Sequence, residues 1–132
     1  MTAQPLHGRS QRGSAIADFA LVSVVLVPLF FGVLQLALIW HVKTTLTSAA
    51  AEGARYGASY DRSVLDGQHR TEGVVDDTFG DDFDDTVTAA QLHRGGQDIV
   101  EVAVRAEVPT LGFWGPTITV SVQGHALKEY LP

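Results

Sequence analysis

The stretch RGSAIADFALVSVVLVPLFFGVLQLALIW, from Arg12 to Trp40, decides the fold. Between Ala15 and Trp40 it contains a single charged residue, Asp18. A helix of that length measures about 39 Å, and the apolar core of a bilayer is about 30 Å thick. We therefore expect one tilted helix that spans a membrane, with Trp40 at its interfacial end. A helix buried in a soluble domain is the poorer alternative, because so small a chain could not cover it on every side.

Composition limits the classes of function. The chain has 132 residues, which is the size of one small domain, and it has no cysteine, so it can form neither a disulfide nor a thiolate metal site. Its net charge is -6, with fifteen acids against nine Lys and Arg. Because phosphate binding requires a basic surface, no nucleic acid partner is expected.

The charge and hydropathy pattern divides the chain into three regions. Residues 1–13 are a basic leader with Arg9 and Arg12, residues 14–58 are one long helix, and residues 59–132 are a small acidic domain. Past the apolar run the helix continues through KTTLTSAAAEGARYGASY, where Glu52 precedes Arg55 by three residues and is expected to pair with it.

Small side chains recur every four residues on this extension, at Ala49, Gly53 and Gly57. Such a strip lets another helix or a sheet approach closely. It could accept a partner or seat the protein's own domain, and the spacing leaves both open.

The remaining residues predict a short helix and a small antiparallel sheet, so the fold class is α+β and pilin-like. Apolar residues recur at helical spacing between Arg62 and Phe83, although two glycines interrupt them. Apolar and polar residues alternate over residues 100–108 and 117–126, which is typical of strands with one buried face, and less clearly over residues 86–93.

A loop with two prolines joins the two clearer strands. It concentrates apolar residues at Leu111, Phe113 and Trp114. These either close the bottom of the core, which we favour, or form a docking surface for another subunit.

Catalytic motifs are not found in the sequence. The five histidines are scattered without metal-ligand spacing, and no nucleophile elbow or phosphate-binding loop occurs. The acidic stretch Asp76 to Asp85 has oxygen ligands for calcium but lacks the order of an EF-hand, so a solvated turn is favoured. We expect no enzyme activity, no cofactor and no metal.

The start of the apolar run contains the most specific pattern. A basic leader ends in Gly13, Ser14 begins the apolar segment, and Asp18 and Phe19 are its fifth and sixth residues. This resembles the prepilin cleavage pattern. Together with AAAEGARYGA at residues 49–58, it resembles the TadE-like family of pseudopilins, the minor pilins of tight-adherence (Tad) pili, a branch of type IV pili. That family usually has glutamate where this chain has Asp18.

The resemblance implies a structural role in pilus assembly. A prepilin peptidase would cut between Gly13 and Ser14, and the freed amine would pair with Asp18, with Phe19 beside it, and so fix the register of subunits. The alternative for Asp18 is a solvated position at headgroup depth. The implied partners are the membrane, the prepilin peptidase, and other pilin and Tad assembly subunits.

Charge predicts the orientation. His7, Arg9 and Arg12 precede the span whereas Lys43 alone follows closely, so the N-terminus is expected inside the cytoplasmic membrane and the acidic domain outside. An ordinary single-pass protein whose outer domain binds a partner is the second candidate. A secretory signal cut near Ala49 to Ala51 is disfavoured, because its apolar core would be too long.

Overall fold

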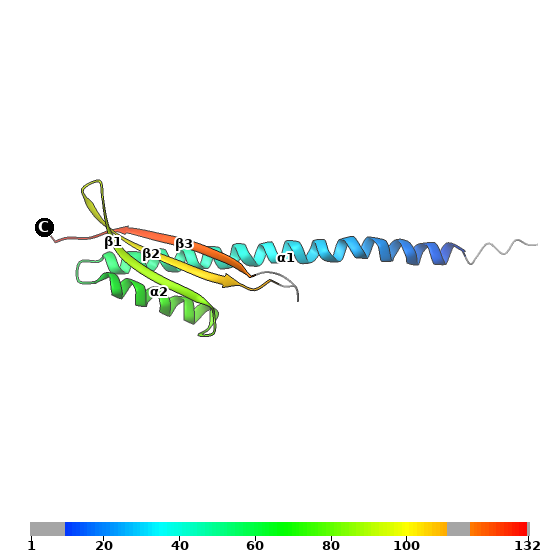
Figure 1. Ribbon diagram of the computed structural model, residues 1–132, viewed down its shortest axis with the longest axis horizontal. Coiled ribbons are helices and arrows are strands. Elements are labelled where there is room, and N and C mark those ends of the chain that lie inside the picture. The colour runs from blue at the N-terminus through cyan, green and yellow to red at the C-terminus, as the bar shows by residue number, and fades with distance from the viewer. Residues whose placement is uncertain (1–9, 111–116, 132) are drawn as a thin grey trace, which may run out of the picture. The chain divides into compact units, whose positions relative to one another are not determined.

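The computed structural model describes residues 10–110 and 117–131. In chain order its elements are α1 (Ser10–Ala58), α2 (Val64–Phe79), β1 (Asp85–Arg94), β2 (Gln97–Val108) and β3 (Ile118–Leu127) (Figure 1). The predicted α+β class, with a long N-terminal helix, a short helix and a small antiparallel sheet, is confirmed. Two compact units divide the chain, Met1–Leu36 and Ala37–Pro132.

Helix α1 is longer at its start than the sequence predicted. It begins at Ser10 rather than Ser14, so Gly13 lies inside the first turns instead of before them. The good helix formers Gln11 and Arg12 precede Gly13 and offset its poor helix propensity. The helix continues through Pro28, which removes one backbone hydrogen bond, and it ends at Ala58 as predicted.

The first unit presents apolar side chains to its surroundings. Ile16 is 71% exposed and Leu21 is 68% exposed, and the large residues that follow are similar. Among the described residues, the helix from Gly13 to Ala58 is long and apolar enough to cross a membrane. Its most apolar stretch of 18 residues has a mean hydropathy of 2.5. None of that stretch is buried within the chain, whereas the core helix of a soluble protein is mostly buried.

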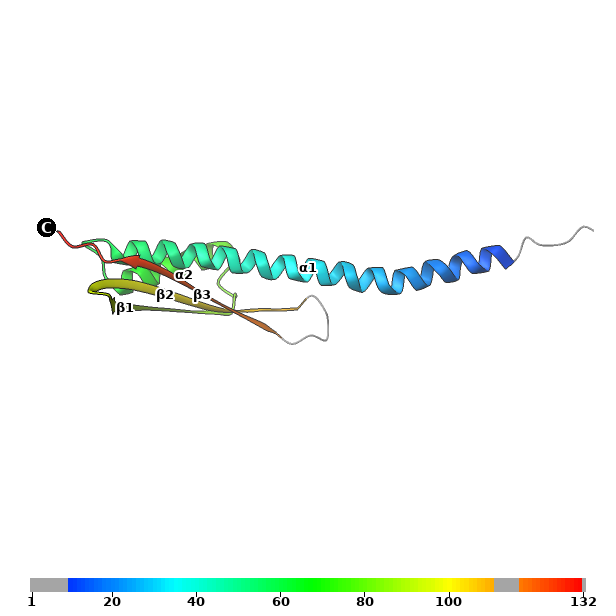
Figure 2. The same ribbon diagram turned by 90° about the horizontal axis from the view of Figure 1, so that it is seen from above.

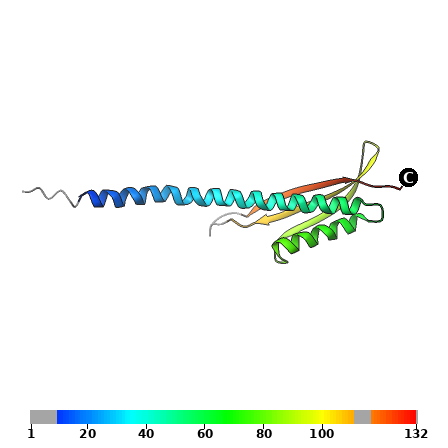
Figure 3. The ribbon, with the colours of Figure 1, turned by 180° about the vertical axis from the view of Figure 1, so that it is seen from behind.

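The second unit has two layers. The end of α1 and helix α2 lie side by side (Figures 1 and 3), and the sheet covers one side of both helices (Figure 2). The strand order is β1-β2-β3, and both pairs are antiparallel. The weakly predicted third strand is therefore real, and it pairs with β2 from Asp85 to Arg94.

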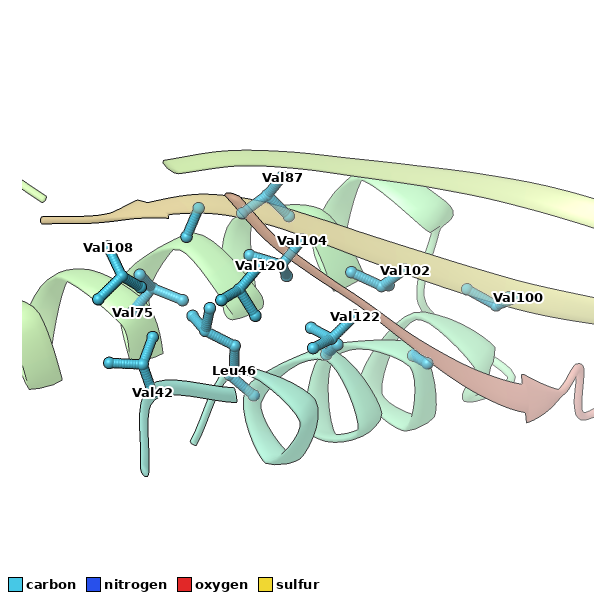
Figure 4. Packing of buried hydrophobic residues seen from close by; sticks show 14 of the residues in the cluster. Val42, Leu46, Val75, Val87, Val100, Val102, Val104, Val108, Val120 and Val122 are labelled. Carbon is cyan, nitrogen blue, oxygen red and sulfur yellow. The ribbon is translucent and has the colours of Figure 1, made fainter. Parts of the chain in front are cut away.

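Valines from the sheet meet apolar residues of both helices in the core. Val42 and Leu46 of α1 and Val75 of α2 point toward the sheet, and the alternating valines of β2 and β3 point back at them (Figure 4). Full burial of one such side chain contributes about 1.5–3 kcal/mol. The strand pattern of residues 100–108 thus produces the buried face that it predicted, with Val100 and Val102 fully buried.

Helix α2 has a defined start and a defined end. The Ser63 side chain accepts from the backbone N–H of Asp66, and the Asp66 carboxylate accepts from the backbone N–H of Ser63 at 2.7 Å, which forms a capping box. This hydrogen bonding lowers the pKa of Asp66. The helix stops before Gly80, which has a φ of 91°, so the prediction that it reached Phe83 was too long.

Candidate functional site

The residues of the cleavage-like pattern lie on the first turns of α1. Gly13, Ser14, Asp18 and Phe19 are all exposed, and Phe19 is 73% exposed. Among the described residues, a side chain added at Gly13 would meet nothing within 4 Å. No described part of the chain therefore covers this segment, and glycine lowers the cost of unwinding the helix there.

Ser14 and Asp18 lie one helical turn apart on the same face. Side chains in a helix lean toward its N-terminus, so the Asp18 carboxylate leans toward the backbone of Ser14. If the chain began at Ser14, an ammonium group and the first free N–H groups of the helix would stand at that end. Both would favour a nearby carboxylate.

The strip of small residues on α1 is occupied by helix α2. A side chain added at Gly53 would lie 1.8 Å from Thr71 Oγ1 and 2.6 Å from the Gly67 carbonyl. At Gly57 the added atom would lie 3.1 Å from the Gly67 Cα. Ala49 is buried, and the Thr71 hydroxyl lies 3.4 Å from its carbonyl oxygen. Of the two alternatives, the structure shows the protein's own domain seated on the strip.

The sequence analysis missed the other half of this contact, Gly67 and Thr71. These two residues share the four-residue spacing of the strip, and this spacing could have identified them. Thr71 is fully buried and its hydroxyl donates to the Gly67 carbonyl at 3.0 Å. The polar group is thereby satisfied inside the helix pair.

The predicted pair between Glu52 and Arg55 was wrong. Glu52 instead accepts from Arg70 of α2, at 2.9 Å from Nε and 2.6 Å from Nη2. The hydrogen bonds and charge of Glu52 raise the pKa of Arg70. Arg55 donates to the carbonyl of Ala51, within its own helix, at 3.3 Å. Glu52 thus forms its ion pair across the contact between the two helices and not within α1.

Gly124 and Lys128, near the C-terminus, attach the sheet to the end of α1. The sequence analysis singled out neither of them. Gly124 of β3 lies against the backbone of α1, because an added side chain would come within 2.4 Å of Ala50 and Ala51. Lys128 Nζ donates to one carbonyl in the last turn of α1, that of Gly57 at 3.0 Å, and to two in the loop that follows, those of Ser59 at 3.0 Å and Arg62 at 2.6 Å. For Gly124 the sequence did contain a signal, because a glycine inside a strand pattern often marks a close approach of another backbone.

The acidic stretch surrounds one partly buried carboxylate. Burial raises the pKa of Asp85, and the charges of Asp76, Glu72 and Asp84 raise it further. In the described part of the chain, no three histidine or carboxylate side chains are arranged to hold a metal ion. The predicted docking residues Leu111, Phe113 and Trp114 lie outside the described residues.

Comparison with known proteins gives one match. Residues 13–55 match the family model described as TadE-like protein. No curated protein and no solved structure matches the chain. The family match covers the cleavage-like pattern, the apolar run and most of the strip on α1. It confirms the resemblance to the TadE-like family over residues 13–55, and with the apolar helix it indicates a single-pass membrane protein associated with the Tad pilus.

Proposed function

We propose that this protein is a membrane-anchored minor pilin (pseudopilin) that takes part in assembly of a Tad pilus. The observation that carries the proposal is the order of Gly13, Ser14, Asp18 and Phe19 at the start of an exposed apolar helix, inside the segment that matches the family. In this function the leader lies in the cytoplasm, the helix crosses the inner membrane, and the acidic domain lies outside. The basic residues of the leader support that orientation.

Processing would create the charge that Asp18 needs. Cleavage after Gly13 converts the amide nitrogen of Ser14 into an ammonium group. A lone charge near a membrane is costly, at about 2.5–3.5 kcal/mol in the centre of a helix and less near its end. Pairing the amine with Asp18 of the same or a neighbouring subunit offsets both costs, and between neighbours it fixes the axial register.

Cleavage is tested by mass. Removal of the first 13 of 132 residues leaves 119 residues. We expect the natural chain, produced with a prepilin peptidase, to have that mass, and Gly13→Leu to remain full length in the membrane. Gly32→Leu is the matched control, because an added side chain meets nothing within 4 Å at either glycine. A 119-residue product from Gly13→Leu would contradict the proposal.

The role of Asp18 is tested separately from cleavage. Asp18→Asn keeps the shape of the side chain and removes its charge, so we expect normal cleavage but loss of pili by electron microscopy. Asp18→Glu, which has the residue usual in the family, should support at least as many pili as the natural chain. Normal pili from Asp18→Asn would show that Asp18 is a solvated residue at the membrane surface. If the natural chain is not cleaved, and if cells that lack it still form normal pili, the alternative of a single-pass binding protein would be favoured instead.

A further inference from the structure

Strands β1 and β3 are the two edges of the sheet, one on either side of β2 (Figure 1). On the side away from β2, the backbone N–H and C=O groups of each edge strand have no other described strand to pair with. Such an edge is a template for a strand of another chain. Natural proteins usually protect it with charged side chains, proline or a bulge.

Neither edge of this sheet has that protection. Strand β3 contains no proline, Lys, Arg, Asp or Glu in its 10 residues, and β1 contains none between Thr86 and His93. Both strands pair with β2 residue for residue over their full length, so neither has a bulge. The charged residues of the sheet are concentrated on the central strand instead, where they protect no edge: Asp98, Glu101, Arg105 and Glu107.

We propose that the β3 edge pairs with the β1 edge of a second copy of this chain. Strands β1 and β3 are both antiparallel to β2, so they run in the same direction. Two copies with the same orientation would therefore join these edges as a parallel pair. This shared orientation rests on the proposed function, in which every copy inserts into the membrane the same way.

The two layers of the domain favour this pair of edges over a pair of like edges. When β3 joins β1 of a copy displaced sideways along the sheet, the helices of both copies lie on the same side, and both layers continue. Joining two β3 edges of copies with one orientation would instead put the helices of one copy on the opposite face.

The register of the sheet predicts which residues meet. Residues that lie side by side across the three strands form its rows, and through β2 Thr88 shares a row with Gln123. Leu92 shares another row with Leu127. A sideways displacement puts Gln123 beside Thr88 of the second copy, and Leu127, which is 56% exposed, beside Leu92 of the second copy. Polar side chains thus meet polar ones, and the exposed leucine meets another leucine.

Charge complementarity supports the same register. Continuing the rows past the end of β3 brings Glu129 opposite Arg94 of the second copy, which is the last residue of β1. Both residues are exposed, and neither makes an ion pair within the described part of the chain. Opposite charges across neighbouring strands stabilise a pair, and no two charges of like sign meet along the two strands.

The contact joins unlike edges, so it does not close on itself. Each added copy again offers a free edge to the next one. Contacts of this kind generate a ring or an open helical assembly. The sheet therefore gives the domain a means to join copies of the chain in a row.

The test uses the absence of cysteine from the chain, which makes each introduced thiol unique. One full-length copy carries Thr88→Cys, and a second copy, with a larger affinity tag, carries Gln123→Cys. The two are produced together in native membranes, oxidised, and separated by mass under non-reducing conditions. We expect at least five times more disulfide between the unlike variants than between two copies of either variant.

Ala103→Cys in place of Gln123→Cys is the matched control, because Ala103 lies in the same row on the central strand. Random pairing of the two edge variants, or a yield no greater than that of the control, would overturn the proposal. A disulfide formed mainly with a protein of a different mass would overturn the choice of a second copy.

Charge reversal tests the register. Arg94→Glu in the Thr88→Cys copy should lower the yield of the mixed disulfide several-fold, because two acids then meet. Glu129→Arg in the Gln123→Cys copy should restore that yield. Arg105→Glu, on the central strand, is the control and should leave the yield unchanged. No loss with Arg94→Glu, or a loss that Glu129→Arg does not restore, would overturn the register.

The cleavage assay is independent of these yields. A natural chain that stays full length but gives the expected disulfides would refute the pilin function and leave the edge contact in place. A natural chain that is cleaved and supports pili, but whose variants form no mixed disulfide, would refute the edge contact alone.

Discussion

The apolar side chains near the start of helix α1 are mostly large, and those near its end are mostly small. In the first unit the apolar residues are mostly large and exposed, as at Ile16 and Leu36. In the second unit, from Ala49 to the end of the helix, the buried residues are alanine and glycine, and Ala50 and Ala54 are fully buried. Hydrophobicity alone therefore does not show which part of this helix is buried in the protein. Val42 and Leu46 of α1 are also buried, but from Ala49 to Ala58 the buried side chains are small, and small residues allow a neighbouring helix or sheet to approach at backbone distance.

Because of this difference, the free energy of folding comes from packing in the second unit. Folding there buries Leu46 and the valines of the sheet, whereas the large side chains of the first unit gain nothing from the chain's own packing. Substitutions of equal chemistry should therefore differ in effect between the two ends of α1.

The largest difference is expected between two leucines of α1. Leu46 is fully buried, and Leu36 is 69% exposed. Leu46→Ala leaves a cavity and should lower the free energy of unfolding of the domain by about 2–5 kcal/mol. Leu36→Ala should leave it unchanged within about 0.5 kcal/mol. Denaturant unfolding of the full chain in detergent micelles measures both, and equal losses would refute the division of α1.

A second contrast uses glycines. Gly124→Ala should destabilise the domain by about 1–3 kcal/mol, because the added methyl group would come within 2.4 Å of the α1 backbone, which cannot rotate away. Gly73→Ala is the control, since Gly73 lies in α2 with nothing within 4 Å. That change should stabilise the helix by about 0.5–1 kcal/mol. A neutral Gly124→Ala would show that β3 can move away from α1.

Sequence patterns predicted the elements whose signals are local. Alternation predicted the buried faces of β2 and β3, and length and hydropathy predicted α1. The contacts between elements were harder, because they join residues that are distant in the chain. Glu52 had Arg55 nearby in sequence, yet Arg70 of α2 is its partner. Gly67 and Gly124 had signals in the sequence, the four-residue spacing and the strand pattern, but only the structure shows which backbone each glycine faces.

A smaller effect is expected where the sheet meets the end of α1. Lys128 Nζ donates to three carbonyls in and after the last turn, where the helix dipole favours a cation. Lys128→Met keeps the length of the side chain but removes the charge and the donors. We expect a loss of about 1 kcal/mol in unfolding free energy. Lys43→Met is the control, because Lys43 is exposed on α1, and a similar loss there would point to a general charge effect.

The smallest expected effect has the opposite sign and depends on pH. Burial and neighbouring acids raise the pKa of Asp85, so ionising this group costs the folded state more than the unfolded state. Its unfavourable contribution is therefore complete at neutral pH and disappears as the pH falls below the ordinary value of 3.8.

Asp85→Asn should accordingly raise the free energy of unfolding by up to about 0.5 kcal/mol at pH 7 and change it little at pH 3. Acid also weakens the chain elsewhere, since hydrogen bonds from Tyr130 and His93 lower the pKa of Asp98. Variant and natural chain must therefore be compared at the same pH, in the same micelles. Asp77→Asn, at an exposed position of α2 in the same acidic surface, controls for the general loss of negative charge. An equal gain from Asp77→Asn would assign the effect to net charge rather than to the partly buried position of Asp85.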